Sequence, residues 1–421
     1  MEKKKYKVAT LGCRTNQYES QAYTDQLRAM GYVPAGEGEA ADLCIVNTCT
    51  VTASADSSSR HQIRKLALQN PGSKLVVTGC FVENYKDEIA KIEGVTDIIP
   101  NKQKEDLLSL IFPDMEVPEF AIEHFAAHTR AFVKVQDGCE SYCTYCTIPY
   151  TRGRSRSRRL VDILKEVHTL IANGYKEIVL TGVNIGDFDG APVEGEPRLR
   201  LVDLVRAVDE IEGLKRLRIS SIDPDEVDKE LVDAILGGKT CCPSMHIVLQ
   251  SGSNVILKRM NRKYTRQIFI DTIEYLRSRE PEFTFTTDII VGFPGETEVD
   301  FQETLEMMDL VKFAKVHMFP YSDRKRTRAS LYPNKVPQDV MAARKALLLR
   351  KAEEISFSLR QEYVGKKMSV LIEAEERPGF FSGHTENFLQ VLIPGTHFRS
   401  NDLIEVTFVS NTPEGLIGHV D

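Results

Sequence analysis

The first hundred residues alternate short apolar runs with segments of helical periodicity. Runs rich in β-branched residues predict buried parallel strands, and the periodic segments predict the helices that cover them. Strands are expected at 7–11, 43–47, 74–78 and 97–99, and helices at about 17–30, 54–69 and 85–92. This alternation is typical of an α/β fold with an open parallel sheet, which we assign to an amino-terminal domain at 1–112.

A second α/β series begins beyond residue 130. Residues 113–130 carry Pro113 and Pro118 without a clear period, so we interpret them as a linker. Six strand-like runs separated by helix-like stretches follow, at 132–136, 177–181, 216–220, 246–249, 284–291 and 314–319. Six βα units favour a partial (βα)6 barrel over 131–337 rather than a complete eight-unit barrel.

The pattern changes again toward the carboxyl terminus. A long helix is predicted at about 340–362, within a connecting segment at 338–364. Beyond it, short strands alternate with turns that contain Gly and Pro, at 368–373, 388–393, 403–408 and 416–419. This pattern predicts a small all-β barrel at 365–421.

Composition excludes several classes of protein. The 54 Lys and Arg residues are outnumbered by 61 Asp and Glu residues, and the resulting net charge of −7 argues against a uniformly basic nucleic-acid binder. Any contact with nucleic acid must therefore use local basic patches. No apolar run approaches the ~18 residues of a membrane span, and no signal-peptide stretch is apparent. We expect a cytoplasmic protein without membrane association.

The cysteines carry the strongest chemical signal. Nine of them cannot all pair internally, and a cytosolic protein is not expected to use a disulfide framework. Cys139, Cys143 and Cys146 form a C-x3-C-x2-C run directly after the first strand of the predicted barrel. Three thiolates so close together can bind one soft metal centre. A closed zinc site needs four ligands, so an iron–sulfur cluster with one open iron fits better, with zinc or no metal as the alternatives.

Three further cysteines, Cys13, Cys49 and Cys80, each follow the end of a predicted strand of the first sheet. Open α/β sheets bind ligands at this edge. Separations of 36 and 31 residues exclude a compact metal knuckle, so only the folded sheet can bring the three together. The alternative is that they are ordinary buried cysteines. The remaining three, which we interpret as non-ligands, are Cys44, Cys241 and Cys242.

The C-x3-C-x2-C run, with Tyr145 before its last cysteine, resembles that of the radical S-adenosylmethionine (SAM) enzymes. This resemblance implies a [4Fe-4S] cluster whose open iron binds SAM and whose reduction releases a 5′-deoxyadenosyl radical. Through the segments 10–20, 46–49 and 77–80, the chain resembles the methylthiotransferases over essentially its full length. In that family a second [4Fe-4S] cluster is held by the residues that match Cys13, Cys49 and Cys80, so both sets of three cysteines are expected to be catalytic.

Further matches to this family lie at the strand ends of the predicted barrel, at 181–184, 218–222, 249–253 and 286–297. Each alone is better explained as an ordinary turn, but together they mark the edge where barrels of this kind bind ligands. The residues that the resemblance assigns to SAM binding are Tyr145, Gly182, Asn184, Ser220, Ser221, Gln250 and Asp288.

Basic residues concentrate in three segments, at 152–159, 258–266 and 324–328. A solvated surface is the plain alternative, particularly for the second segment. The first segment directly follows the presumed cluster loop, and arginine suits bidentate phosphate contacts. We therefore predict that an anticodon stem-loop is bound by Arg152, Arg154, Arg156, Arg158, Arg324 and Arg326.

The carboxyl-terminal barrel resembles the TRAM domain, a small RNA-binding module. Its net charge is negative, so any RNA contact there must draw on aromatic stacking. The candidate aromatic residues, for which core packing is the alternative, are Phe380, Phe381, Phe388 and Phe398.

The resemblance implies a tRNA methylthiotransferase, an enzyme that transfers alkylthio groups. In this family carbon 2 of an N6-modified adenosine at position 37 gains a methylthio group, with sulfur delivered at the second cluster and methyl donated by a second SAM. The residues at 10–19 favour the branch that acts on N6-threonylcarbamoyladenosine. One departure is the Arg-Lys-Arg-Thr segment at 324–327, where relatives more often have Pro-Gly before Thr.

Four alternatives remain at this point. Two are relatives, which act on N6-isopentenyladenosine in tRNA or on an aspartate of a ribosomal protein. The others are a single-cluster radical enzyme and a zinc-dependent RNA-binding protein without catalysis. Besides tRNA, we expect a reductant protein such as a flavodoxin or ferredoxin as a partner, and a monomeric chain.

Overall fold

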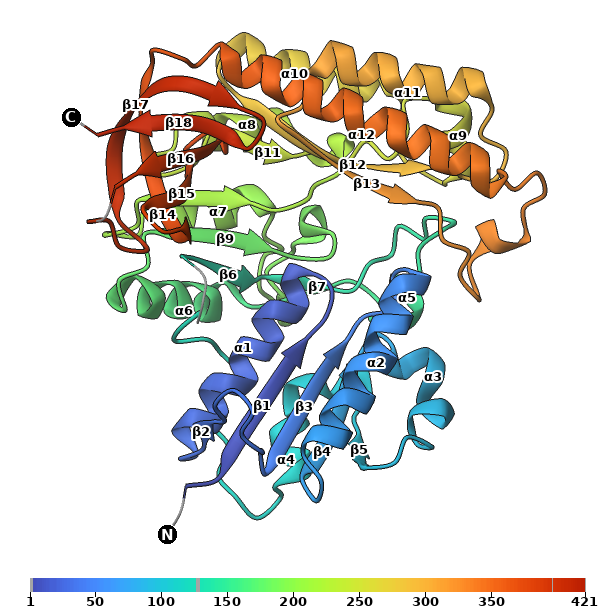
Figure 1. Cartoon of the computed structure of the whole chain (residues 1–421), viewed down its shortest axis with the longest axis vertical. Coiled ribbons are helices and arrows are strands. Elements are labelled where there is room, and N and C mark those ends of the chain that lie inside the picture. The colour runs from blue at the N-terminus through green and yellow to red at the C-terminus, as the bar shows by residue number, and fades with distance from the viewer. Residues whose placement is uncertain (1–2, 126–128, 396, 421) are drawn as a thin grey trace.

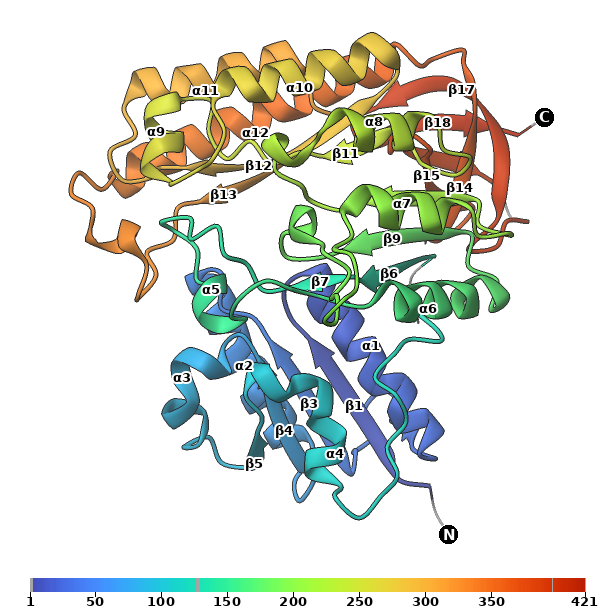
Figure 2. The same ribbon diagram turned by 180° about the vertical axis from the view of Figure 1, so that it is seen from behind.

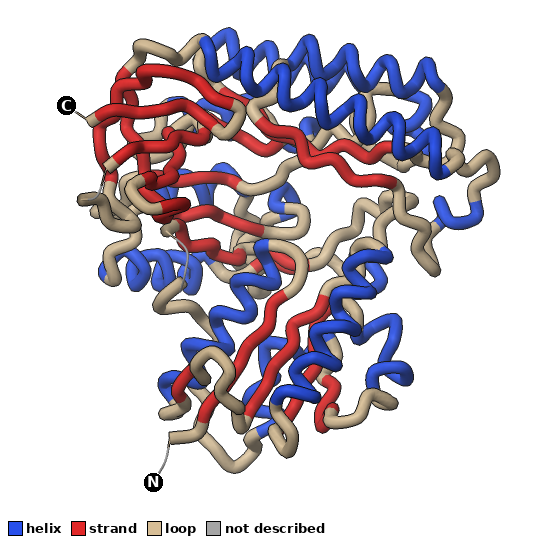
Figure 3. The backbone as a smooth tube through the Cα atoms, in the orientation of Figure 1, coloured by secondary structure: helices blue, strands red, loops and turns tan. Residues whose placement is uncertain are grey.

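The computed structural model describes residues 3–125, 129–395 and 397–420 (Figure 1). An amino-terminal sheet lies at the bottom of this view, below a central set of strands and helices. A small carboxyl-terminal barrel lies against one end of the central set. Figure 3 shows the strands of the three parts as separate groups, with the helices arranged mainly along their outer sides.

The amino-terminal sheet has five parallel strands in the order β2-β1-β3-β4-β5, namely β1 Lys5–Thr10, β2 Val33–Pro34, β3 Leu43–Thr48, β4 Lys74–Gly79 and β5 Val95–Ile98. Every residue of β3 is buried because helices cover both faces of the sheet. Ile45 belongs to the core on one face, and Cys44 and Val46 to the core on the other. The helices of this part are α1 Arg14–Ala29, α2 Ala53–Gln69, α3 Val82–Ile89 and α4 Leu107–Ile111, with a 3-10 helix at Asn101–Asp106.

The central part contains the six parallel strands that the sequence predicts. They form two sheets in the orders β10-β9-β6 and β11-β12-β13, joined by isolated bridges between β10 and the β11 region. Their bounds are β6 Arg130–Lys134, β9 Glu177–Thr181, β10 Arg216–Ile219, β11 Ser244–His246, β12 Thr284–Val291 and β13 Lys315–Pro320. A two-stranded antiparallel pair accompanies them, β7 Gln136–Asp137 with β8 Arg156–Ser157.

Helices cover the outer side of these strands, and Figure 2 shows α6, α7 and α8 from that side. Their apolar faces pack against the strands and make one large core with them, in which Leu170 and Leu204 are fully buried. The helices of the central part are α5 Ile148–Thr151, α6 Leu160–Ala172, α7 Leu201–Asp209, α8 Lys229–Leu236, α9 Asn254–Arg259, α10 Arg266–Arg279, α11 Glu298–Val311 and α12 Gln338–Gln361.

The carboxyl-terminal part is a closed five-stranded barrel in the order β14-β15-β16-β18-β17. Its strands are β14 Lys367–Arg377, β15 Phe380–Thr385, β16 Gln390–Pro394, β17 Leu403–Thr412 and β18 Gly415–His419. Arg216 and Arg218 of β10 donate hydrogen bonds to its backbone carbonyl groups, including those of His384 and Thr385. These contacts fix the small barrel against the starting ends of the central strands.

Two expectations need correction. The strand expected at 246–249 lies at Ser244–His246, so its carboxyl end comes earlier than the pattern indicates. β15 is not among the strands predicted from the sequence, because its polar residues and Gly383 interrupt the alternation of apolar and polar side chains that is typical of a strand. Gly383 is required there, since a Cβ would lie 2.4 Å from the carbonyl oxygen of Leu371 on the paired strand. Within the described part of the chain, no helix combines the length and apolar character needed to cross a bilayer.

Candidate functional site

The three amino-terminal cysteines lie at the carboxyl ends of three adjacent strands. Cys13 follows β1, Cys49 follows β3 and Cys80 follows β4. Because these strands are parallel neighbours, their ends meet at one edge of the sheet. Cys49 and Cys80 are buried, and Cys13 is exposed. The fold therefore gathers thiols that are far apart in the sequence.

Two glycines permit this close approach. Gly12 has a φ of +94°, and a Cβ at this position would lie 2.8 Å from the Sγ of Cys49. Gly79 has the same φ, and a Cβ there would lie 2.5 Å from the carbonyl oxygen of Thr48. Only glycine adopts this backbone without strain and leaves the neighbouring chain in place.

The environment of these thiols disfavours a free thiolate. Burial raises the pKa of the Cys49 thiol to about 11, and the thiols of Cys80 and Cys13 reinforce the shift. Burial also raises the pKa of Cys80, although the guanidinium of Arg152 acts in the opposite direction. A deprotonated sulfur here needs a cationic partner, which a bound metal cluster supplies.

The other three cysteines lie on the loop that follows β7. The loop turns tightly, since the amide of Cys146 donates to the carbonyl of Cys143 at 3.0 Å. Gly138, with a φ of +74°, precedes Cys139, and a Cβ there would lie 2.0 Å from the carbonyl oxygen of Arg154. Glycine therefore allows the loop to pass directly beneath the arginine-rich segment that follows it.

Arg262 is a functional candidate that the sequence identifies only as one member of the basic segment 258–266. Its Nη1 donates to the Sγ of Cys143 at 3.0 Å, and its other nitrogen pairs with Asp223. The side chain is almost fully buried. Hydrogen bonds to ligand sulfurs and nearby charge adjust the reduction potential of iron–sulfur clusters, so Arg262 is placed to influence a cluster on this loop.

Both sets of cysteines provide the donors that an iron–sulfur cluster needs. Each set offers three thiols, the soft ligands that such clusters use, and leaves one iron without a protein ligand. Among residues 3–125, 129–395 and 397–420, no three His, Cys, Asp or Glu side chains are arranged as a ready site for a single metal ion.

A cavity of about 170 Å³ lies beside the loop that carries Cys146. Cys146 and Tyr145 line it on one side, and Val51 and Thr52, which come soon after Cys49, line it on another. The rest of its wall comes from strand ends of the central part: Gln250, Asp288, Ile290 and residues 319–322. The cavity therefore lies where the cluster loop meets the segment that follows Cys49, and Cys146 contributes to its wall.

The segment of Gly182 and Asn184 is held by hydrogen bonds to Gln136 and Glu226, two residues that were not predicted from the sequence. The Oε1 of Gln136 accepts from the amides of Val183 and Asn184, each at 2.9 Å. A Cβ at Gly182 would lie 2.9 Å from that same oxygen, which explains the glycine. The side chain of Asn184 donates to Glu226 at 3.0 Å. Burial, reinforced by Asp223, raises the pKa of Glu226 to about 7.

Several buried polar atoms at these strand ends lack a hydrogen-bond partner within the described residues, namely Ser220 Oγ, Glu226 Oε2 and Gln250 Oε1. Gln250 also has a φ of +62°, a costly conformation for a residue with a side chain. Buried polar atoms without partners, beside strained backbone, fit a site for a polar small molecule. Ser221 is only half-buried, and the ring of Tyr145 packs edge-on against Phe293 at 6.4 Å.

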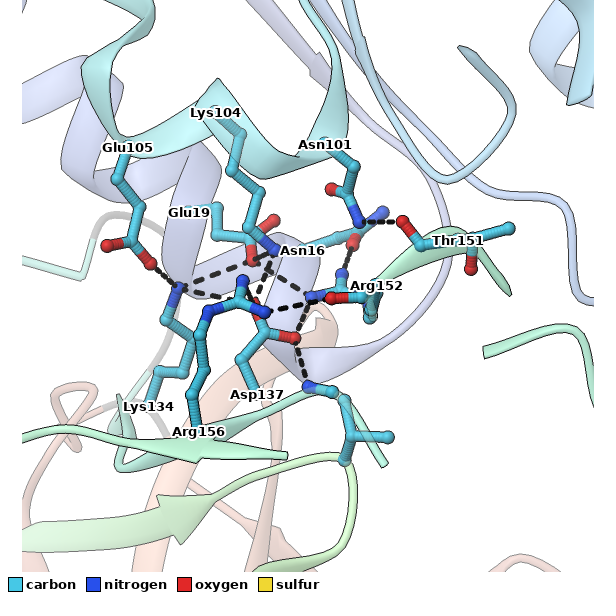
Figure 4. Close-up of polar contacts among 12 residues, drawn as sticks. Asn16, Glu19, Asn101, Lys104, Glu105, Lys134, Asp137, Thr151, Arg152 and Arg156 are labelled. Atoms are coloured by element: carbon cyan, nitrogen blue, oxygen red, sulfur yellow. Dashed lines mark hydrogen bonds and ion pairs between the residues drawn. The ribbon is translucent and has the colours of Figure 1, made fainter. Parts of the chain in front are cut away.

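Arg152 lies in a buried network of charges that joins the amino-terminal sheet to the cluster loop (Figure 4). Its Nη1 lies 3.1 Å from Glu19 and 2.8 Å from Asp137. Lys104 contacts both of these carboxylates at 2.6 Å. The side chain of Arg152 is fully buried, so the prediction that it contacts RNA is corrected.

Arg158 and Arg324 also serve internal contacts. Arg158 pairs with Glu166 at 2.5 Å, and Arg324 pairs with Asp56 at 2.6 Å and is nearly buried. The predicted RNA contact of Arg324 is corrected because its side chain is buried. Arg158 is 21% exposed, so its RNA contact stays a prediction although Glu166 already pairs with it. Arg154 and Arg326 are exposed, and Arg156 is partly exposed although it pairs with Asp137. The arginine-rich segments thus divide into residues that hold the parts together and residues that face solvent.

Comparisons with known proteins cover the whole chain. The family described as "Uncharacterized protein family UPF0004" matches residues 5–100, and the "Radical SAM superfamily" matches residues 133–308. The chain is 46% identical over 99% of its length to the "Threonylcarbamoyladenosine tRNA methylthiotransferase MtaB" of Chlamydia pneumoniae, covering 98% of that protein. It is 34% identical over 94% of its length to a protein of the same name from Bacillus subtilis, covering 92% of that protein.

A further relative is the "tRNA-2-methylthio-N(6)-dimethylallyladenosine synthase" of Desulfotalea psychrophila, which is 35% identical over 91% of both chains. Among solved structures, the fold resembles the radical SAM methyltransferase TsrM of Kitasatospora setae, with a TM-score of 0.58 over 90% of this chain and 81% of that one. At 12% identity this likeness concerns the fold alone. The full-length similarity to named enzymes shows that this chain belongs to the methylthiotransferase family of the radical SAM superfamily, whose members use SAM and two [4Fe-4S] clusters.

Proposed function

We propose that this enzyme adds a methylthio group to carbon 2 of N6-threonylcarbamoyladenosine at position 37 of tRNA. The observation that carries the proposal is the 46% identity over 99% of the chain to a relative named for this substrate. The relative named for N6-dimethylallyladenosine is 35% identical and remains the second candidate. Membership of an enzyme family removes the alternative of a zinc-dependent protein without catalysis.

In this proposal the loop cysteines hold one cluster and the strand-end cysteines hold the other. When bound, the clusters and SAM supply reductive radical chemistry and a site for sulfur. The chain's own residues provide the surroundings. Arg262 donates a hydrogen bond toward Cys143, and Ser220, Asn184 and Gln250 offer polar contacts to the cofactor.

We further propose that Arg154, Arg156 and Arg326 bind the phosphates of the anticodon stem-loop. Of the aromatic candidates in the terminal barrel, Phe381 is buried in its core and packs against Phe398. Phe388 stacks on His384. Phe380 is partly exposed and is retained as a stacking candidate. Domain limits at 1–112, 131–337 and 365–421, a cytoplasmic location, a monomeric state and a flavodoxin- or ferredoxin-like reductant complete the proposal.

The function is tested with the anaerobically reconstituted protein, SAM, a reductant and tRNA that carries either N6-threonylcarbamoyladenosine or N6-isopentenyladenosine. We expect mass spectrometry of the digested nucleosides to show a methylthio product only from the first tRNA. A product only from the second would transfer the enzyme to the other branch. Changing Cys13, Cys49 and Cys80 together to Ala is expected to stop thiolation and to leave SAM cleavage in place, whereas unchanged iron content would refute the two-cluster arrangement.

A further inference from the structure

A small pocket lined by cationic side chains lies inside the central part, separate from the cavity beside the loop that carries Cys146. Its lining includes three arginines, a histidine and two phenylalanines: Arg14, Arg130, Arg218, His246, Phe132 and Phe388. Positive charge between apolar walls favours a small anionic group attached to a larger body. Phe388 is one of the aromatic candidates of the terminal barrel and Arg218 lies in a segment that matches the family, whereas no site predicted from the sequence includes Arg14, Arg130, Phe132 or His246.

Two of the three arginines already have carboxylate partners. Glu177 lies 2.8 Å from Arg218 and 3.0 Å from Arg130, and Arg130 also pairs with Glu373. Arg14 differs, because its guanidinium has no hydrogen bond or ion pair with any residue that the structure describes. Its guanidinium lies 5.4 Å from the ring centroid of Phe132. An arginine held in a pocket without a partner is available to an anion from outside the chain.

The charges around Arg14 make its guanidinium more available to an anion from outside the chain. Arg130 and Arg218 repel its guanidinium, whereas Asp288 and Glu177 attract it. Glu177 is already shared by two arginines, and Asp288 lies 3.3 Å from the Nε2 of a histidine. A bound anion would offset the mutual repulsion of the arginines, so the pocket gains stability when it is occupied.

The pocket is adjacent to the site of the proposed reaction. Arg14 directly follows Cys13, so its backbone belongs to the amino-terminal set of cysteines. On β12, Thr286 lines the pocket, while Asp288 and Ile290 line the cavity. Alternate residues of a strand share one face, and two residues span about 7 Å. The pocket and the cavity therefore lie along the same face of β12, about two residues apart.

We propose that Arg14 determines substrate specificity by binding the carboxylate of the N6-threonylcarbamoyl group, an inference that rests on the function proposed above. The planar guanidinium matches a carboxylate through two parallel hydrogen bonds. An apolar substituent such as isopentenyl would leave the cation without a partner, and sites built for a polar group reject analogues that lack it. The pocket thereby selects for charge as well as for shape.

The test uses three synthetic anticodon stem-loops, which carry N6-threonylcarbamoyladenosine, its neutral methyl ester or unmodified adenosine at position 37. Their dissociation constants are measured with the reconstituted enzyme. We expect the wild type to bind the free acid about 10- to 100-fold more tightly than the ester, as a charge-assisted hydrogen bond implies. Arg14→Gln is expected to abolish this preference, and Arg14→Lys to retain part of it.

Controls separate this role from others. Arg350→Gln alters an exposed arginine on α12 and is expected to leave the preference unchanged. The affinity for SAM, measured without RNA, should be the same in Arg14→Gln, and its loss would assign Arg14 to the cofactor carboxylate instead. Thermal unfolding verifies that each variant is folded. An equal loss of affinity for all three RNAs in Arg14→Gln would overturn the proposal.

The outcomes also distinguish this inference from the proposed function. A wild type that thiolates N6-threonylcarbamoyladenosine but binds the acid and the ester equally refutes only the role of Arg14. So does an Arg14→Gln variant that keeps the full preference for the acid. A wild type that thiolates only N6-isopentenyladenosine refutes the proposed function itself.

Discussion

Residue 12 is glycine and has no Cβ, and this allows the loop of Cys13 to lie against Cys49. The added Cβ of Gly12→Ala would meet the Sγ of Cys49 at 2.8 Å. Because both atoms cannot keep their places, we expect this variant to lose iron at the amino-terminal set while SAM cleavage persists. After reconstitution, iron and sulfide analysis should give about half of the wild-type content.

The matched control is Gly38→Ala. Gly38 also has a positive φ of +73°, but no atom lies within 4 Å of its built Cβ. The control therefore carries the backbone strain without the collision. Equal iron content in the two variants would show that the contact between Gly12 and Cys49 is not what shapes the site.

Glu226 leads to a second prediction for a single residue, on how the stability of the folded protein depends on pH. Its folded pKa is raised to about 7 by burial and by Asp223, above its ordinary value of 4.5. The folded protein therefore holds a proton that the unfolded chain has released, and stability falls as the pH rises from about 4.5 to 7. Urea unfolding of Glu226→Gln should show a smaller decline over this range than the wild type, by about 1–3 kcal/mol. Identical slopes would contradict the assignment.

At the scale of elements, α1 and the cluster loop are joined through buried charges rather than through apolar packing alone. Glu19 of α1 and Asp137 of β7 share Arg152 and Lys104. These cations hold the pKa of Glu19 at about 2 despite its burial. This contribution is present above pH 4.5 and is lost as the pH falls toward 2.

Removing one member of this network leaves the remaining buried charges only partly compensated. We expect Arg152→Met to lower the free energy of unfolding by about 3–5 kcal/mol, because Glu19 and Asp137 lose one of the two cations that they share. Arg154→Met is the matched control, since that side chain is 85% exposed and should change stability by less than about 0.5 kcal/mol. Chemical denaturation of both variants provides the comparison, and similar midpoints would contradict a structural role for Arg152.

At the scale of the whole molecule, negative net charge coexists with a localised cationic surface. Arg154 and Arg326 are exposed, on the segment after the cluster loop and on the segment after β13. We expect the double variant Arg154→Glu, Arg326→Glu to bind tRNA more weakly. Each lost phosphate contact should also reduce the slope of log affinity against log salt by about 0.7–0.9. Arg156 is left intact because it pairs with Asp137.

Filter binding over a range of salt concentrations measures both quantities. Arg350→Glu on α12 changes the net charge without altering this surface and serves as the control. If the double variant keeps the affinity and the salt dependence of the wild type, tRNA binds elsewhere on the molecule.

The sequence alone predicts nearly all strands of the amino-terminal and central parts, because β-branched runs and helical periodicity are local signals. It also places both sets of cysteines, since each follows a predicted strand. β15 is not predicted from the sequence, because the glycine at 383 is required by the close approach of the neighbouring strand and not by the local pattern of β15. Gln136 and Glu226 escape prediction because their partners lie more than 40 residues away.

Only the tertiary structure decides which charges are free. Arg152 and Arg154 are two residues apart and chemically identical, yet one is fully buried between carboxylates and the other faces solvent. A run of arginines in the sequence shows which cationic side chains are present, but it does not show which carboxylates from distant segments pair with them. The sequence by itself determines the fold class and the thiol chemistry, because these depend on local pattern and spacing. The tertiary structure decides the roles of the arginines, including the unpaired Arg14, because pairing depends on segments brought together only by folding.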